Sequence, residues 1–132
     1  MQEKPTFNHE ADLIHKTEKF IASWFKQSLS DELSDFFILP GGKTIEKQVV
    51  VSRLKGIFGK SDQYIGGRYD IIDSNFETYG EGKGIGFVEG VAGFRAVLKN
   101  QSKIVSGPFK LFFGLQNGQW KIVNIVFPGF TY

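Results

Sequence analysis

The sequence predicts an α+β fold in which N-terminal helices pack in the concave face of a strongly curved, mainly antiparallel sheet, giving a cone. Three observations support this class. Apolar residues recur at helical spacing as far as about residue 58, the pattern alternates with a period of two from residue 62, and turn-forming residues separate the alternating segments. We therefore expect a flexible tail at residues 1–7 and a single domain at residues 8–132.

The first helix is predicted at about residues 8–28. Asn8 is a good N-cap because its side-chain oxygen can accept from the first free backbone amides. A wide apolar stripe then follows at helical spacing, which is typical of a helix that packs on a core. Ser30 is expected to cap a second, short helix at residues 31–35.

A short strand and a third helix complete the first half. The apolar run at residues 36–39 reads as a strand, and the turn Pro40-Gly41-Gly42 ends it. Thr44 is expected to cap a helix at residues 45–58, with Gly59 placed as its C′ residue.

The second half is predicted to form four long antiparallel strands joined by tight turns. Asn117-Gly118, between the last two, is a strong signal for a two-residue hairpin, and Asn100-Gln101-Ser102 is expected to form an earlier turn. The predicted strands cover residues 62–79, 85–99, 103–116 and 119–127.

These strands are apolar on both faces. In the strand at residues 86–98, Val88 and Phe94 share one face with small apolar residues, while Phe87, Glu89 and Arg95 share the other. The last strand is apolar on both sides as well. A sheet covered by helices on one side only should be polar on its second side. We therefore expect a homodimer through the convex face.

Composition excludes several classes of function. The 16 basic and 14 acidic residues give a net charge of +2 with no concentrated basic stripe, so no nucleic-acid partner is expected. The chain has no cysteine, and the spacing of His9 and His15 does not direct both at one metal, so neither a metal nor a cofactor is expected. No apolar stretch is long enough to span a membrane, so no membrane partner is expected.

The order of elements resembles the nuclear transport factor 2-like superfamily, which includes SnoaL-like and ketosteroid-isomerase-like proteins. The segment Asn117-Gly118-Gln119-Trp120-Lys121-Ile122-Val123 is similar to the turn, glycine, tryptophan and basic residue with which the family begins its last strand. The resemblance covers roughly residues 8–128. It implies a pocket at the open end of the cone and dimerisation through the convex sheet, but no single activity.

The resemblance also provides a test for isomerase activity. Ketosteroid isomerases carry a tyrosine on the first helix and an aspartate before a proline in the following strand, and an ungapped comparison places Phe20 and Leu39 at these two positions. Neither side chain can serve as an acid or a base. The sequence therefore favours a protein that is not an enzyme.

Five residues are candidates for a ligand pocket. Asn124 is an amide within an apolar strand, and it needs a partner in a ligand, in the protein or in a dimer interface. Tyr69 and Asp70 lie in a strand that should line the cone, although they point to opposite faces. Trp24 and Phe20 lie on the apolar stripe of the first helix. Glu89 and Arg95 are expected on the outer face.

The function predicted from the sequence is a non-catalytic domain for association or for binding a small hydrophobic ligand, with a largely apolar pocket. An isomerase or dehydratase acting on a small hydrophobic substrate, and a secreted interaction module, are the alternatives. Residues 1–10 are polar, so no signal peptide is expected in this segment. A cytoplasmic location is favoured slightly, and a periplasmic or secreted location stays open.

Overall fold

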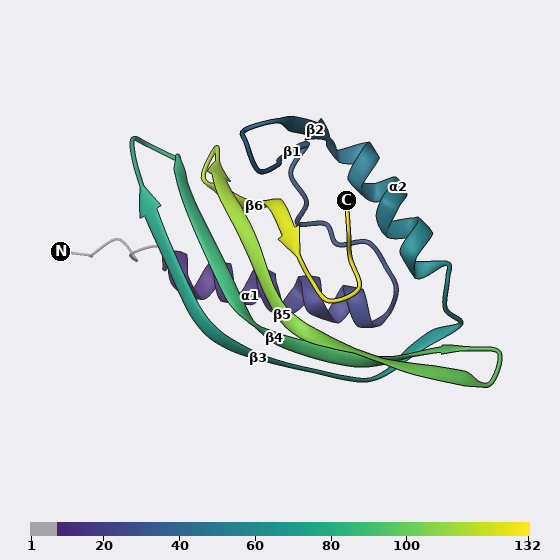
Figure 1. Cartoon of the computed structure of the whole chain (residues 1–132). Coiled ribbons are helices and arrows are strands. Elements are labelled where there is room, and N and C mark those ends of the chain that lie inside the picture. Colours follow the sequence, from purple (N-terminus) through teal and green to yellow (C-terminus); the bar gives the residue numbers. More distant parts are fainter. Residues whose placement is uncertain (1–7) are drawn as a thin grey trace.

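The computed structural model describes residues 8–132 and has the α+β architecture (Figure 1). The tail predicted at residues 1–7 lies outside the described residues. The elements are α1 (His9–Phe25), β1 (Phe36–Ile38), β2 (Thr44–Glu46), α2 (Lys47–Phe58), β3 (Gln63–Thr78), β4 (Gly84–Leu98), β5 (Gln101–Gln116) and β6 (Gln119–Val126).

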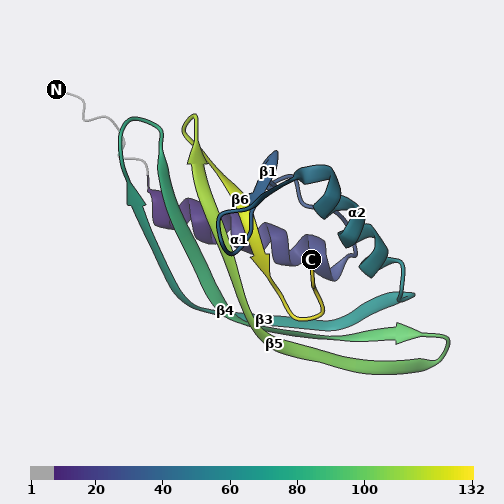
Figure 2. The same cartoon turned by 45° about the horizontal axis from the view of Figure 1, so that its top comes forward.

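The main sheet is antiparallel throughout, with the strand order β3-β4-β5-β6. Strands β3, β4 and β5 bend together along their length, and α1, α2 and the C-terminal segment lie on the concave side of the bend (Figures 1 and 2). Strands β1 and β2 form a separate two-stranded sheet. The predicted strand bounds agree with the structure to within two residues.

Two of the turns are formed by residues with left-handed backbone. Asn117 and Gly118 have φ values of 51° and 79°, which fit the type I′ geometry expected of Asn-Gly. Lys99 and Asn100 have φ values of 49° and 68°, so this turn lies one residue earlier than Asn100-Gln101-Ser102. Both turns suit the right-handed twist of the strands that they join.

Helix α1 begins as predicted and ends three residues earlier. The side chain of Asn8 accepts a hydrogen bond from the Ala11 amide at 3.0 Å, which confirms the N-cap. Gln27 adopts φ 54°, which ends the helix. Its side-chain amide then donates to the carbonyls of Phe58 and Ser61 at 2.7 and 3.0 Å, so the end of α1 is tied to the end of α2.

The short helix predicted at residues 31–35 is wrong. This segment instead runs parallel to β6, because the Ile122 amide donates to the Glu32 carbonyl at 2.8 Å and the Ser34 amide donates to the Ile122 carbonyl at 2.9 Å. The Ser30 hydroxyl accepts from the Glu32 amide, as in a local turn. Pairing with the edge of the sheet satisfies backbone groups that a single helical turn would leave free.

The N-cap predicted at Thr44 is also wrong. Thr44 pairs with Ile38 in the small sheet, and α2 begins only after Glu46, whose side chain makes no capping hydrogen bond. Gly59 ends α2 at the C-cap with φ −74°, and thus without the left-handed conformation of a C′ glycine.

The core lies between the concave face of the sheet and the two helices. Val88, Ala92 and Phe94 lie on the buried face of β4. The alternation in the sequence had placed them on one face and Phe87 on the other. Alternate residues of β5 join it, and in β6 a bulge between Ile122 and Asn124 shifts the alternation, so that Trp120, Ile122 and Ile125 are all buried. The largest fully buried side chains of the core are Trp24, Trp120, Phe37, Phe109, Phe113, Leu13, Ile21, Leu54, Leu111, Ile122 and Ile125.

Candidate functional site

The concave interior is occupied by aromatic side chains of the chain itself. Phe20 and Trp24 of α1 are both buried, with ring centroids 6.1 Å apart. Phe127 lies 4.5 Å from Trp24 and Phe58 lies 5.0 Å from it, measured between centroids. The buried Trp24 Nε1 has no hydrogen-bond partner among the described residues. Such tilted and edge-to-face contacts stabilise a filled interior beyond simple burial.

The C-terminal segment closes this interior. After β6 the chain turns back, and Phe130 is buried with its ring centroid 6.3 Å from Trp24 and 4.8 Å from Tyr132. Figures 1 and 2 show this segment on the concave side, in the space between the sheet and α2. The aromatic tail therefore packs on its own domain.

Asn124 has protein partners at both ends of its amide. Its Nδ2 donates to the Ile38 carbonyl at 2.6 Å, and its Oδ1 accepts from the Tyr132 hydroxyl at 3.0 Å. The Tyr132 hydroxyl accepts in turn from the Ile125 amide at 2.6 Å. Burial raises the pKa of Tyr132 to about 12, an effect that the Ile125 hydrogen bond partly opposes. A ligand role for Asn124 stays a prediction.

Tyr69 and Asp70 point to opposite faces, as expected from their adjacent positions. Tyr69 pairs with Ala92 on the concave face, and its hydroxyl donates to Glu18 of α1 at 3.3 Å. Burial and the Glu18 charge raise the pKa of Tyr69. Asp70 pairs with Val91 on the convex face. The five candidates are therefore divided: Phe20, Trp24 and Tyr69 lie on the concave side, and Asp70 and Asn124 on the convex side.

An open cavity of about 880 Å³ lies on the convex face, where it forms a groove across all four long strands. Its lining is mostly apolar. Several large side chains in it are exposed, including Ile85 at 54%, Phe112 at 36% and Val126 at 48%. The residues that line it are Ile38, Leu39, Pro40, Asn75, Phe76, Glu77, Ile85, Gly86, Phe87, Phe112, Phe113, Val123, Asn124 and Val126.

Sequence reasoning identified only Asn124 among these groove residues as a site candidate. The signal for the others was present in the alternation, because Phe87, Phe112 and Val126 all fall on the face opposite the core. The alternation alone does not show which apolar face the helices cover. The contribution of Ile38 and Pro40 depends on a loop that packs beside β6, and no local pattern predicts that contact.

Charged residues of the convex face form pairs between neighbouring strands. Glu89 lies 3.8 Å from the Lys110 ammonium, which also sits 4.2 Å from the Phe87 ring centroid and 5.1 Å from that of Phe112. Arg95 donates to the Ser102 hydroxyl at 3.1 Å. Glu89 and Arg95 thus occupy the outer face, as expected.

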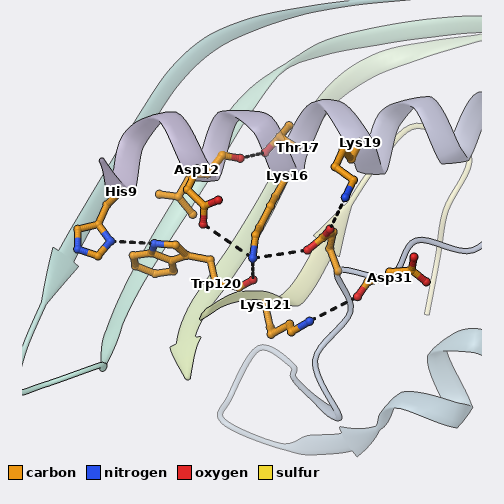
Figure 3. A network of polar contacts seen from close by, with 10 residues as sticks. His9, Asp12, Lys16, Thr17, Lys19, Asp31, Trp120 and Lys121 are labelled. Atoms are coloured by element: carbon orange, nitrogen blue, oxygen red, sulfur yellow. Dashed lines mark hydrogen bonds and ion pairs between the residues drawn. The ribbon is translucent and has the colours of Figure 1, made fainter. Parts of the chain in front are cut away.

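A second polar cluster ties α1 to the edge of the sheet (Figure 3). The Lys16 ammonium donates to the Trp120 carbonyl at 2.9 Å and lies 3.6 Å from Glu32 and 3.8 Å from Asp12. Lys19 adds a further contact to Glu32 at 3.2 Å. These contacts join residues far apart in the sequence, so they stabilise the packing of α1 against β6 and the segment beside it.

Within residues 8–132, no three histidine or acidic side chains gather in a group that could hold a metal ion. None of the helices in this range is both long and apolar enough to cross a membrane.

Comparisons with solved structures identify the class of fold. The chain is similar to the association domain of calcium/calmodulin-dependent protein kinase II from C. elegans, with a TM-score of 0.55 and 12% identity over 88% of this chain and 92% of that one. A putative domain of the same kind from Xanthomonas campestris gives a TM-score of 0.52 and 12% identity, over 94% and 89% of the two chains. The fold is therefore nuclear transport factor 2-like.

A third similar structure shows the same fold inside a longer protein. The helical cell shape determining protein Pgp2 from Campylobacter jejuni gives a TM-score of 0.56 and 15% identity, over 95% of this chain and 44% of that one. No family model matches the sequence, and no curated protein sequence matches it. At these identities the similarity establishes the fold alone.

Proposed function

We propose that this domain is a non-catalytic association module that forms a homodimer through the convex face of its sheet. The observation that carries the proposal is the groove of about 880 Å³, because large apolar side chains that line it stay partly exposed within residues 8–132. Monomeric proteins rarely leave a large contiguous apolar patch in water. A second copy of the same face would cover it, and a two-fold contact needs only one self-complementary surface.

Two further features support association over binding in the interior. The concave side is filled by Phe20, Trp24, Phe58, Phe127 and Phe130, so a small ligand entering there would have to displace side chains. Two of the similar structures are described as association domains. Both features support association through the convex face of the sheet over ligand binding inside the cone.

The test is the oligomeric state of the wild type and of two variants, measured by sedimentation velocity over a range of concentrations. Phe112→Lys places a charge in the centre of the groove, and we expect it to weaken the dimer by at least about thirtyfold, as for an aromatic hot spot. Ile104→Lys is the matched control, because Ile104 is exposed on the same face of β5 but lies outside the groove.

A wild-type protein that stays monomeric at roughly 100 µM, well above the usual dissociation constants of stable dimers, would overturn the proposal. Native mass spectrometry of the protein purified from cells should then be used to look for a small apolar molecule bound in the groove. Such a molecule, released by Phe112→Lys, would favour the ligand-binding function instead.

A further inference from the structure

Rows of residues cross the convex groove from β3 to β6, because the strand register places outward-facing residues side by side. The central row is Asn75, Phe87, Phe112 and Asn124. It has the same residue types when followed from either edge: an amide, two phenylalanines and an amide. A two-fold axis parallel to the strands would reverse the row, so Phe87 of one copy would face Phe112 of the second copy. The central row is thus self-complementary about this axis.

The neighbouring row, toward the Gly80–Gly84 turn, is charged at both ends. It contains Glu77, Ile85, Gly114 and Lys121. Reversal about the same axis places Glu77 opposite Lys121 of the second copy. It also places Ile85, the one large apolar side chain of the row, opposite Gly114, which has no side chain. Opposite charges and opposite sizes therefore meet.

The row on the other side of the centre matches in its inner pair, whereas its ends place Asp73 opposite Val126 of the second copy. It contains Asp73, Glu89, Lys110 and Val126. Reversal places Glu89 opposite Lys110 of the second copy, so the pair already formed within each chain would become a group of four alternating charges. Such alternation compensates each charge as the interface loses water.

A two-fold axis perpendicular to the strands gives a worse match. That axis keeps the order of the strands and exchanges the two outer rows. Glu77 would then face Asp73 of the second copy, and Ile85 would face Glu89. Like charges placed opposite each other disfavour an association. The charge pattern therefore discriminates between the two ways of stacking the sheets.

The charges at the ends of the first row lack ion-pair partners inside the described part of the chain. Glu77 makes no salt bridge there, and Lys121 makes only a long hydrogen bond of 3.5 Å to the Asp31 carbonyl. The two residues lie on opposite edges of the sheet, three strand spacings or about 14 Å apart, so they cannot pair directly within one chain.

From these rows we infer that the domain dimerises about a two-fold axis parallel to its long strands, with Glu77 of each copy paired to Lys121 of the other. This inference rests on the proposed homodimer and specifies its geometry. Aligned stacking of two sheets, at about 30°, is a common packing and is compatible with the axis.

The experiment is a charge exchange at Glu77 and Lys121. Glu77→Lys and Lys121→Glu each create two like-charge contacts in their own homodimer, so each should weaken it by about tenfold. Mixing the two variants restores both pairs, so heterodimers should exceed the statistical half when native mass spectrometry is applied with one variant labelled with ¹⁵N. Lys55→Glu on α2 is the control, because it makes the same charge change as Lys121→Glu on an exposed helix.

The outcomes separate the geometry from the dimer itself. A wild-type dimer that Glu77→Lys strengthens would indicate the perpendicular axis and overturn the inference, while the proposed homodimer stands. A dimer for which neither variant changes the dissociation constant, or for which mixing gives the statistical half, would overturn it too. A wild-type monomer would overturn both. Wild-type affinity in the double variant Glu77→Lys with Lys121→Glu supports the inference.

Discussion

The two faces of the long sheet are both apolar, but only one of them is closed by the chain. On the concave side, α1, α2 and the C-terminal segment cover the sheet, and Phe113 is 1% exposed. On the convex side, its neighbour Phe112 is 36% exposed and lines an open groove. Adjacent residues of one strand thus have the same side chain in opposite surroundings.

Because only the concave face is covered by the chain itself, the two faces contribute to different processes: the concave face to folding and the convex face to association. Apolar area on the concave face is removed from water when a single chain folds, so it contributes to the stability of the monomer. Apolar area on the convex face is removed from water only when a second molecule covers it. Its contribution to the stability therefore depends on the protein concentration. Substitutions on the two faces should therefore differ in size and in concentration dependence.

The largest effect is expected from Phe113→Ala. Removing a buried ring leaves a cavity that the core fills only in part, so the free energy of unfolding should fall by about 3–5 kcal/mol. Urea denaturation followed by circular dichroism measures this loss, which should be the same in dilute and concentrated protein.

Phe112→Ala is the matched variant. In dilute protein it should cost less than about 1 kcal/mol, as for an exposed position, and the loss should grow with concentration as the wild type becomes dimeric. Equal losses for Phe112→Ala and Phe113→Ala in dilute protein would contradict the division between the faces.

A smaller effect is expected from Lys16→Met at the edge of the concave side. The substitution removes the hydrogen bond to the Trp120 carbonyl and leaves the largely buried Glu32 with only Lys19 nearby. We expect a loss of about 2 kcal/mol in the free energy of unfolding, typical of a hydrogen bond to a charged group.

Lys19→Met provides the comparison for Lys16→Met. The Lys19 side chain is exposed and contacts the same carboxylate, so its loss should cost at most about 1 kcal/mol. Differential scanning calorimetry of the two variants at one concentration compares them directly. A larger loss for Lys19→Met would show that burial does not decide the contribution of this cluster (Figure 3).

The sequence predicted the strands well because their signals are local. Alternation separated Val88 from Phe87, and Asn117-Gly118 located the last hairpin, since both depend on neighbouring residues. The helix expected at residues 31–35 and the cap expected at Thr44 failed for the opposite reason. Both segments pair with distant strands, and such pairing overrides a local preference.

The candidate site shows the same limit. An amide in an apolar strand correctly marked Asn124 as a residue that needs partners, yet both partners come from other elements. Ile38 reaches it from β1, and Tyr132 reaches it because the tail folds back. The position of the groove likewise depends on which apolar face of the sheet the helices cover. The alternation along the strands makes both faces apolar, so it does not predict which one stays open.

A small effect is also expected from Tyr132→Phe, which tests how the tail closes the concave side. The variant loses the hydrogen bonds to Asn124 and from Ile125, so it should unfold about 1 kcal/mol more easily at pH 8. Folding raises the pKa of Tyr132 from its ordinary value of about 10 to about 12, so the fold favours the neutral phenol. The stability that this provides is fully present below pH 10 and is lost as the pH rises toward 12.

The difference in stability between wild type and Tyr132→Phe should therefore shrink between pH 10 and pH 12. Urea denaturation across this range measures it, and absorbance at 295 nm should show one tyrosine that ionises near pH 12 in the wild type and is missing from the variant. Tyr79→Phe is the control, because Tyr79 is exposed at the start of the turn that follows β3. A constant difference across the range would mean that the Tyr132 hydroxyl is not held by the folded chain, and the tail would then close the interior through Phe127 and Phe130 alone.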